Sequence, residues 1–277
     1  MREINNIITD GLVGIGAYDQ LIKSAGFEEI ESFSNNFINE AGPLVVSFDN
    51  RWIADPLHQW SRRWEYPYII KNAALLDSNA TIIDLGAGMS FLTFFLEKKL
   101  NLKNITAVDY DKTLSELYEK VNEKIDANVK FQYGDMRNLL DLSSNSADFI
   151  YSVSALEHTN NYTEILKEIY RILKKGGKLS FTFDISIDGL DDIPVAKAEE
   201  LVSALEEVFN TKVGIDIRTS INSNVGELVT SGYIASIDKR LMPWKYPLVN
   251  VLKPIAKRGK IGNLYKNLTF CCLTVVK

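Results

Sequence analysis

Acidic or imidazole side chains follow short apolar runs at four places in this sequence: Asp84, Asp109, Asp135 and the pair Glu157 and His158. Short apolar runs rich in β-branched residues predict buried strands, and the segments between them have apolar residues at helical spacing. Strands that alternate with helices predict a parallel sheet built from right-handed crossovers. The carboxyl ends of such strands meet at one edge, so we expect these side chains to surround one ligand.

A glycine turn follows the first of these strands. Gly86 and Gly88 permit positive φ and let a ligand approach the backbone closely, because neither has a Cβ. A helix is expected over residues 90–99. Dinucleotide-binding folds use a similar turn, with a third small residue where the helix packs on the strand. Phe91 occupies that position here, which disfavours a nicotinamide or flavin dinucleotide.

The motif Asp84-Leu85-Gly86-Ala87-Gly88 resembles the first motif of the class I S-adenosylmethionine-dependent methyltransferases that act on small molecules. The order of the later strand ends is similar to this family from about residue 80 to about residue 185. The resemblance implies an α/β fold, a doubly wound, Rossmann-like sheet of seven mostly parallel strands with a reversed last strand. It also implies an enzyme that uses S-adenosyl-L-methionine and releases S-adenosyl-L-homocysteine.

The resemblance assigns cofactor contacts to individual residues. Asp109 would accept hydrogen bonds from both ribose hydroxyls. Asp135 would reach the adenine amino group, and Met136 would lie against the ring. Arg63, or its neighbour Arg62, would pair with the carboxylate of the methionine part. The remaining cofactor residues implied by the family pattern are Asp84, Gly86, Ala87, Gly88, Met89, Ser90, Tyr110 and Ser154.

Two segments outside the sheet are expected to cover the substrate. Residues 51–68 contain three of the four tryptophans of the chain. Residues 221–266 form a long insertion between two expected final strands, over residues 212–219 and Leu268–Val276. The aromatic residues of these covers either wall the acceptor site or dock a capping helix on the sheet. The candidates for the acceptor site are Trp60, Trp64, Tyr66, Tyr68 and Trp244.

The chain is therefore expected to form one core with additions, since 277 residues with 46% hydrophobic content exceed what this sheet needs. The expected parts are a helical amino-terminal cover over residues 1–75, a cofactor-binding core over 76–220, a substrate-side insertion over 221–266 and the final core strand over 267–277.

Methyl transfer is an in-line displacement at a sulfonium methyl group, so the protein must mainly position and desolvate the nucleophile. His158 follows the fourth strand, and an ordinary histidine pKa near 6.5 suits a base at neutral pH. In many members of the family an acid-histidine pair at this place shapes the loop instead, so both roles stay open. Glu157, Tyr151 and His58 are the other candidates for the base.

The net charge of −5 argues against a protein that coats nucleic acid. From Lys239 onward, however, the chain has basic residues and no Asp or Glu. Such a tail could lie beside a phosphate-bearing substrate or an anionic membrane surface, although a solvated face is the simpler interpretation. Cys271 and Cys272 are expected to be small core residues, and with two histidines in the chain no metal site is predicted.

The opening segment lacks a basic start followed by an apolar run, and no stretch approaches the roughly 18 apolar residues of a membrane span, so a cytoplasmic protein is expected. The favoured function is methyl transfer to a hydroxyl or amine of a small molecule, such as a sugar, a nucleotide-linked compound or a natural product. The alternatives are a cofactor-binding partner subunit with little activity of its own, and a methyltransferase for tRNA or protein.

Overall fold

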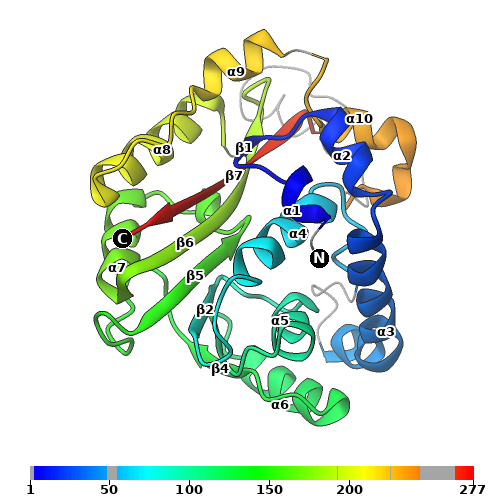
Figure 1. Ribbon diagram of the computed structural model, residues 1–277, viewed down its shortest axis with the longest axis vertical. Coiled ribbons are helices and arrows are strands. Elements are labelled where there is room, and N and C mark those ends of the chain that lie inside the picture. The colour runs from blue at the N-terminus through cyan, green and yellow to red at the C-terminus, as the bar shows by residue number, and fades with distance from the viewer. Residues whose placement is uncertain (1–2, 49–54, 192, 225, 244–265) are drawn as a thin grey trace.

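A seven-stranded sheet forms the centre of the protein, with helices on both faces (Figure 1). This computed structural model describes residues 3–48, 55–191, 193–224, 226–243 and 266–277. The strand order is β1-β7-β6-β5-β2-β3-β4. The strands are β1 (Gly11–Leu12), β2 (Thr81–Leu85), β3 (Asn104–Asp109), β4 (Lys130–Tyr133), β5 (Ala147–Val153), β6 (Leu173–Ser186) and β7 (Leu268–Val276).

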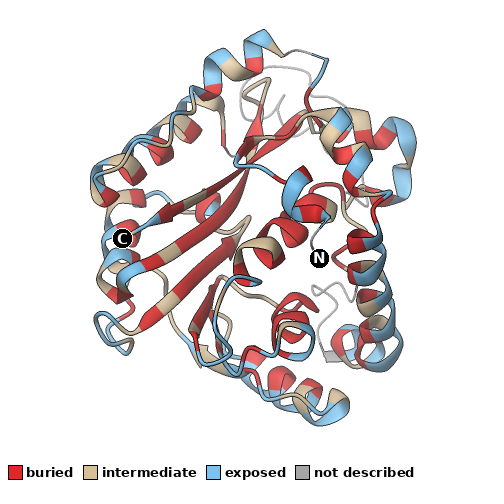
Figure 2. Ribbon diagram, in the orientation of Figure 1, coloured by how far each residue is buried: buried red, intermediate tan, exposed pale blue. Residues whose placement is uncertain are grey.

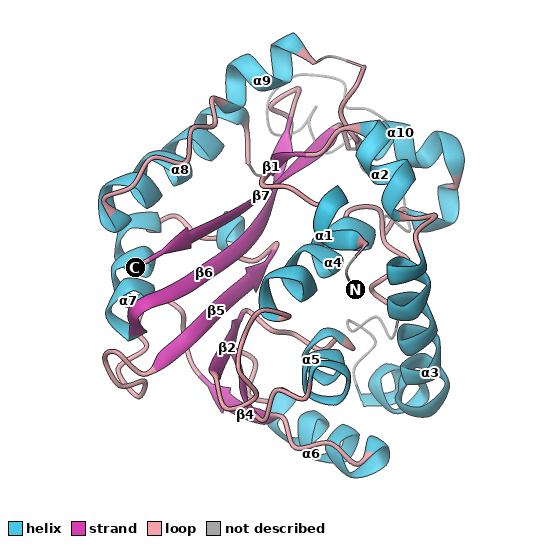
Figure 3. Cartoon of the chain, in the orientation of Figure 1, coloured by secondary structure: helices cyan, strands magenta, loops and turns pink. Residues whose placement is uncertain are grey.

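Helices connect successive parallel strands, except β4 and β5, which a turn-rich loop joins, and helices also form the amino-terminal cover (Figure 3). The cover consists of α1 (Ile4–Ile7), α2 (Ile15–Leu21), α3 (Ala25–Phe48) and α4 (Arg62–Ala73). The later helices are α5 (Leu92–Leu100), α6 (Leu114–Ile125), the 3₁₀ turn η1 (Leu156–His158), α7 (Tyr162–Ile172), α8 (Val195–Phe209), α9 (Ile217–Ser223), α10 (Ser231–Ile237) and the 3₁₀ turn η2 (Lys239–Leu241).

The strand directions confirm the predicted fold class. The strands β6, β5, β2, β3 and β4 are parallel, whereas β7 runs antiparallel to β6 along its whole length, from Lys178 opposite Val276 to Ser186 opposite Leu268. The reversed last strand is thus in place. A parallel sheet of this kind brings the carboxyl ends of β2, β3 and β5 to one edge.

The prediction of a strand over residues 212–219 is wrong. Gly214 has a φ of +67°, and Asp216 caps α9 by accepting a 2.8 Å hydrogen bond from the backbone N–H of Thr219, so this segment turns into a helix. The sheet position beside β7 is taken instead by β1, where Gly11 lies opposite Cys272. The amino-terminal cover therefore contributes an edge strand as well as helices.

Each face of the sheet has its own apolar core, and successive strand residues alternate between the two (Figure 2). Ile82 packs with α3, α4 and α5, whereas Ile83 packs with α7 and α8. Cys272 and Cys271 divide in the same way, and both are buried, free thiols, as predicted. Among the described residues, the helices include none that is both long and apolar enough to cross a bilayer.

Candidate active site

The glycine turn after β2 is held tightly against β3. Gly86 and Gly88 have φ of +72° and +51°. The backbone N–H groups of Gly86 and Ala87 both donate to the carbonyl oxygen of Val108, at 2.9 and 3.2 Å. A Cβ on Gly86 would lie 2.6 Å from the Cβ of Ala155, so only glycine fits this position. The loop after β5 therefore packs directly on the turn.

Asp109, the last residue of β3, is 6% exposed and connects the turn to the next loop. Its Oδ2 accepts a 2.9 Å hydrogen bond from the N–H of Gly88, and its Oδ1 accepts a 3.0 Å hydrogen bond from the N–H of Asp111. Each carboxylate oxygen has a second acceptor direction. Asp109 can therefore bind a pair of hydroxyl groups without giving up its backbone partners.

A cavity of about 900 Å³ opens at the carboxyl ends of β2, β3, β4 and β5. It contains eight residues of the predicted site, namely Gly86, Gly88, Asp109, Tyr110, Asp135, Met136, Ser154 and His158. The other residues lining it are Val108, Asp111, Tyr133, Gly134, Arg137, Ala155, Thr159, Asn160 and Asn161. The bare backbone of the turn, the Asp109 carboxylate and the Met136 side chain fit an adenosyl group.

Asp135 is already engaged by a neighbour. Arg137 contacts both of its carboxylate oxygens, through Nε at 2.9 and 3.0 Å and through Nη2, and the backbone N–H of Arg137 donates to Oδ1 at 2.9 Å. This hydrogen bonding lowers the pKa of Asp135 below its ordinary value. A charged acceptor is therefore present where an adenine amino group is expected.

A second cavity, of about 230 Å³, shares Gly86, Gly88 and Ser154 with the first. The predicted residues that line it besides these three are Tyr66, Asp84, Ala87, Met89 and Ser90. Burial raises the pKa of Asp84 to about 8, and the nearby charge of Asp109 adds to the shift. Asp84 is thus a buried carboxyl that can exist as a proton donor near neutral pH.

The small cavity also contains Arg62 and Gln59, from the start of α4 and the turn before it. The sequence named Arg63 first for a ligand carboxylate, but the structure places the Arg63 guanidinium 4.9 Å from the centre of the Phe27 ring and 3.5 Å from Glu31. Both of those residues belong to α3. Arg63 therefore faces the amino-terminal cover, and its neighbour Arg62 faces the cavity.

Residues 83–181 match the family profile of a methyltransferase domain. They form a class I S-adenosylmethionine-dependent methyltransferase domain. The cofactor of this domain is accordingly S-adenosyl-L-methionine.

Two relatives and one solved structure illustrate the similarity of the methyltransferase domain to known proteins. The sterol 24-C-methyltransferase of Kluyveromyces lactis is 22% identical over 199 residues, which are 69% of this chain and 52% of the relative. The dimethylglycine N-methyltransferase of Parasynechococcus marenigrum is 28% identical over 123 residues, 42% of this chain and 41% of the relative. The chain thus spans about half the length of these relatives or less.

The crystal structure of the [4+2]-cyclase SpnF has a TM-score of 0.50 at 17% identity, covering 87% of this chain and 94% of that one. At this level of identity the likeness shows a shared fold.

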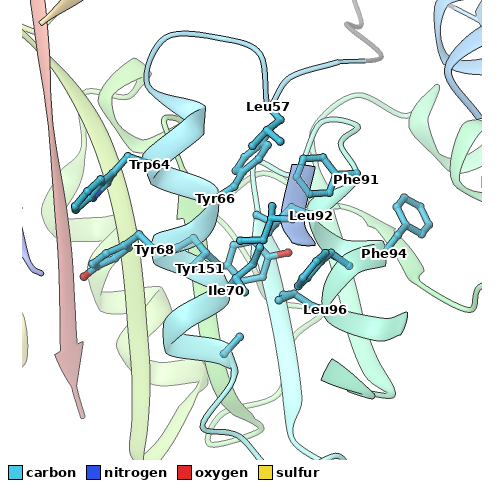
Figure 4. Packing of buried hydrophobic residues seen from close by; sticks show 14 of the residues in the cluster. Leu57, Trp64, Tyr66, Tyr68, Ile70, Phe91, Leu92, Phe94, Leu96 and Tyr151 are labelled. Carbon is cyan, nitrogen blue, oxygen red and sulfur yellow. The ribbon is translucent and has the colours of Figure 1, made fainter. Parts of the chain in front are cut away.

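The aromatic residues predicted for the acceptor side separate into two groups around the methyltransferase domain (Figure 4). Tyr66 points from α4 toward Phe91, with ring centres 5.3 Å apart, and lines the small cavity. Trp64 and Tyr68 point from α4 toward the strands instead. The Tyr68 hydroxyl contacts Asp10 and Thr274, each at 2.7 Å.

Trp60 packs edge-on against Phe270 at 5.5 Å. Neither cavity includes Trp60, Trp64 or Tyr68, so these three side chains dock α4 and the turn before it on the sheet. Trp244 lies outside the described residues.

The candidate bases of the methyltransferase domain occupy different environments. His158 is exposed and lines the large cavity. Glu157 points inward, 3% exposed, and its Oε1 accepts a 3.3 Å hydrogen bond from the backbone N–H of Asp184, which is the contact expected of a residue that shapes the loop. Tyr151 is fully buried, and burial raises its pKa well above the ordinary value. The catalytic roles of these residues stay predictions.

His58 lines neither cavity, although Pro56 and Gln59 beside it line the small one. Its Nδ1 is 2.6 Å from Asp55 Oδ1 and its Nε2 is 3.1 Å from Glu31 Oε1. The hydrogen bond with Asp55 raises the pKa of His58 above its ordinary value. His58 thus connects the turn before α4 to α3, and the structure gives it no contact with the cofactor cavities.

The two predicted covers contact each other in the part of the chain that the structure describes. The N–H of Trp60 donates to the carbonyl oxygen of Leu241 at 2.9 Å. The insertion also contacts the chain before the first cover, since the hydroxyl of Tyr233 donates to Asp19 of α2 at 2.8 Å. Closure of both covers over the mouth of the site stays a prediction, because residues 49–54 and 244–265 lie outside the described residues.

Proposed function

We propose that this chain transfers a methyl group from S-adenosyl-L-methionine to a hydroxyl or amine of a small molecule. The observation that carries the proposal is the pair of cavities that meet at Gly86, Gly88 and Ser154. The large cavity contains Asp109 and Asp135 for the ribose and adenine, and the small one contains polar groups for the methionine part. The reacting sulfonium would then lie near the shared residues.

Arg62 is proposed as the partner of the methionine carboxylate. Its guanidinium is the cationic group among the residues that line the small cavity. Burial opposes the charged form of Arg62, but the carboxylates around it, Glu65 foremost, raise its pKa above the ordinary value. A permanently charged planar fork suits a carboxylate ligand, because it donates two parallel hydrogen bonds.

The acceptor is proposed to enter the large cavity beside the loop after β5. Its volume of about 900 Å³ is at the upper end of ordinary small-molecule sites, so an adenosyl group leaves room for a second ligand. His158, Thr159 and Asn160 line that side. His158 would take the proton of a hydroxyl or ammonium acceptor, while the domain excludes water from the reacting atoms.

A small acceptor agrees with the sterol and dimethylglycine named in the two relatives. The described part of the basic tail gives little support to RNA. Arg240 pairs with Asp238 at 2.7 Å, and Lys266 with Asp191 at 3.1 Å, so these two charges are compensated within the protein.

The test is calorimetric titration of the full chain with S-adenosyl-L-homocysteine and with NAD, followed by incubation with S-adenosyl-L-methionine bearing a labelled methyl group and a panel of small alcohols and amines. We expect the chain to bind S-adenosyl-L-homocysteine and not NAD, and to transfer the labelled methyl group to a small acceptor. Label that enters only RNA or protein would overturn the acceptor class. Cofactor binding without any transfer until a second chain is added would favour the partner-subunit alternative.

A further inference from the structure

Glu65 is a fully buried carboxylate on α4, with 0% of its surface exposed, and it lies beside the site without lining either cavity. A buried charge is costly unless it is paired and hydrogen-bonded. Glu65 meets both conditions. Its Oε2 pairs with Arg62 Nη1, one helical turn earlier, and its Oε1 accepts a 2.8 Å hydrogen bond from the hydroxyl of Ser154.

The three side chains form a closed ring. Arg62 Nη1 also donates to the Oγ of Ser154 at 2.7 Å, so each member of the ring contacts the other two. A further hydrogen bond, of 3.0 Å, joins Arg62 Nη1 to the Oγ of Ser61. Among the described residues, every hydrogen bond that the Arg62 guanidinium makes uses Nη1. Within the part of the chain that the structure describes, its Nη2 and Nε have no hydrogen-bond partner and can donate to a ligand.

Ser154 is fixed in an unusual backbone conformation. Its φ is +45°, a left-handed value that a residue with a Cβ rarely adopts. Its backbone N–H donates to the carbonyl oxygen of Thr182 in β6 at 3.0 Å. The loop after β5 is thus held by the sheet through its backbone and by α4 through the Ser154 side chain. Because Ser154 lines both cavities, the ring lies at their junction.

We propose that Glu65 is a positioning residue for the cofactor, holding Arg62 against Ser154 so that the remaining N–H groups of the guanidinium face the methionine carboxylate. This inference rests on the proposed function, since it assumes that Arg62 binds that carboxylate. Glu65 would act through Arg62 and Ser154 and would not contact the ligand. Through its hydrogen bond with Ser154, Glu65 would also hold α4 and the loop after β5 in one relative position.

The test compares two ligands that differ in the amino-acid part. S-adenosyl-L-homocysteine has the carboxylate, whereas 5′-methylthioadenosine keeps the adenosyl thioether and lacks it. Calorimetry on Glu65→Gln is expected to show S-adenosyl-L-homocysteine binding weakened about tenfold to hundredfold, the effect of one charge-assisted hydrogen bond. Binding of 5′-methylthioadenosine should stay within about twofold. A general loosening of the fold would weaken both.

The matched control is Glu168→Gln on α7. Glu168 also pairs with an arginine three residues away, Arg171, at 2.9 Å, but lines neither cavity. Glu168→Gln should leave the affinities for S-adenosyl-L-homocysteine and 5′-methylthioadenosine unchanged. In addition, Glu65→Gln should have little further effect when Arg62 is already replaced by glutamine, because the two residues would act as one unit.

Ser154→Gly keeps the left-handed backbone accessible and removes the hydroxyl, so it tests the ring if Glu65→Gln does not fold. It should also weaken S-adenosyl-L-homocysteine selectively. Suppose that the wild-type chain binds both ligands. If the variants then weaken the binding of both ligands equally, or weaken neither, the positioning role is overturned while the proposed function stands. If the wild-type chain binds neither ligand, the proposed function falls and this inference falls with it.

Discussion

The carboxylate of Asp109 accepts a 2.9 Å hydrogen bond from the backbone N–H of Gly88, so the end of β3 holds the glycine turn that follows β2. The same carboxylate lines the large cavity. One side chain therefore both shapes the turn and presents acceptors to the ligand. The cofactor geometry should be sensitive to this residue.

Replacing Asp109 with alanine should weaken S-adenosyl-L-homocysteine binding by about 2–4 kcal/mol. Two hydrogen bonds to a charged group, each of about 1.5–3 kcal/mol, would be lost and partly replaced by water. Calorimetry measures the change, and Asp141→Ala, at an exposed position outside both cavities, is the control. Unchanged affinity in a folded Asp109→Ala variant would show that the ribose is bound elsewhere.

Gly86→Ala should destabilise the protein and weaken cofactor binding. The added Cβ would lie 2.6 Å from the Cβ of Ala155 and 3.3 Å from Met136 Cε, at a φ of +72°. Overpacking costs about 1–3 kcal/mol, and the left-handed backbone about 1–2 kcal/mol more. Chemical denaturation measures the loss in unfolding free energy.

Two further variants separate the two causes of the Gly86→Ala effect. The double variant with Ala155→Gly should recover the packing part and leave the backbone part. Gly176→Ala has a φ of +81° with nothing within 4 Å of the added Cβ, so it reports the backbone cost alone. Equal losses in Gly86→Ala and Gly176→Ala would argue against the close contact with Ala155.

His158→Ala should lower turnover by about 10²–10⁴ if the imidazole takes the acceptor proton, because that is the usual effect of removing a general base. Affinity for S-adenosyl-L-homocysteine should stay near the wild-type value, since the residue lies on the acceptor side of the large cavity. Single-turnover transfer of labelled methyl to the identified acceptor measures the effect. A loss of only a few-fold would leave His158 as a loop-shaping residue.

Asp184, at the carboxyl end of β6, should make stability depend on pH. Burial, assisted by the charge of Glu65, raises its pKa to about 7, while Arg62 and Lys266 act in the opposite direction. The folded protein therefore binds a proton between about pH 4 and pH 7 that the unfolded chain releases. Stability should fall as the pH rises through this window, by at most about 1.4 kcal/mol per pH unit.

Asp184→Asn removes this titration, so its advantage over the wild type should grow from pH 5 to pH 8. The pKa of Glu157 is also raised, by burial and then by the charge of Asp184, so both proteins are compared in a Glu157→Gln background. Urea denaturation at the two pH values measures the difference. Parallel stability profiles for the two proteins would contradict the assignment of the proton to Asp184.

The cofactor side was predictable from sequence because its signals are local. Glycines after a β-branched run and acids after the following strands occupy positions that the alternation of strand and helix brings to one edge. The choice between Arg62 and Arg63 was harder, because neighbouring helix residues point about 100° apart and the facing side depends on how α4 packs. That packing involves Phe27 and Glu31, which lie some thirty residues earlier.

The prediction of a strand over residues 212–219 failed for a related reason. Val213, Ile215 and Ile217 alternate with other residues, which is the pattern of a strand. Gly214 and Asp216, between them, have the conformations of a turn and a helix cap. Their effect on the chain exceeds that of the alternation. Sequence reasoning likewise gave no signal that Gly11 and Leu12 would supply the missing edge.

The pairing of β1 with β7 joins an early segment of the sequence to one that is synthesised more than 250 residues later. Gly11 lies opposite Cys272, and Tyr68 contacts both Asp10 and Thr274. During synthesis β1 cannot pair with β7 until Leu268–Val276 has left the ribosome. Such long-range closure is slow, so the open edge of the nascent sheet is the place where chaperones or aggregation would act first.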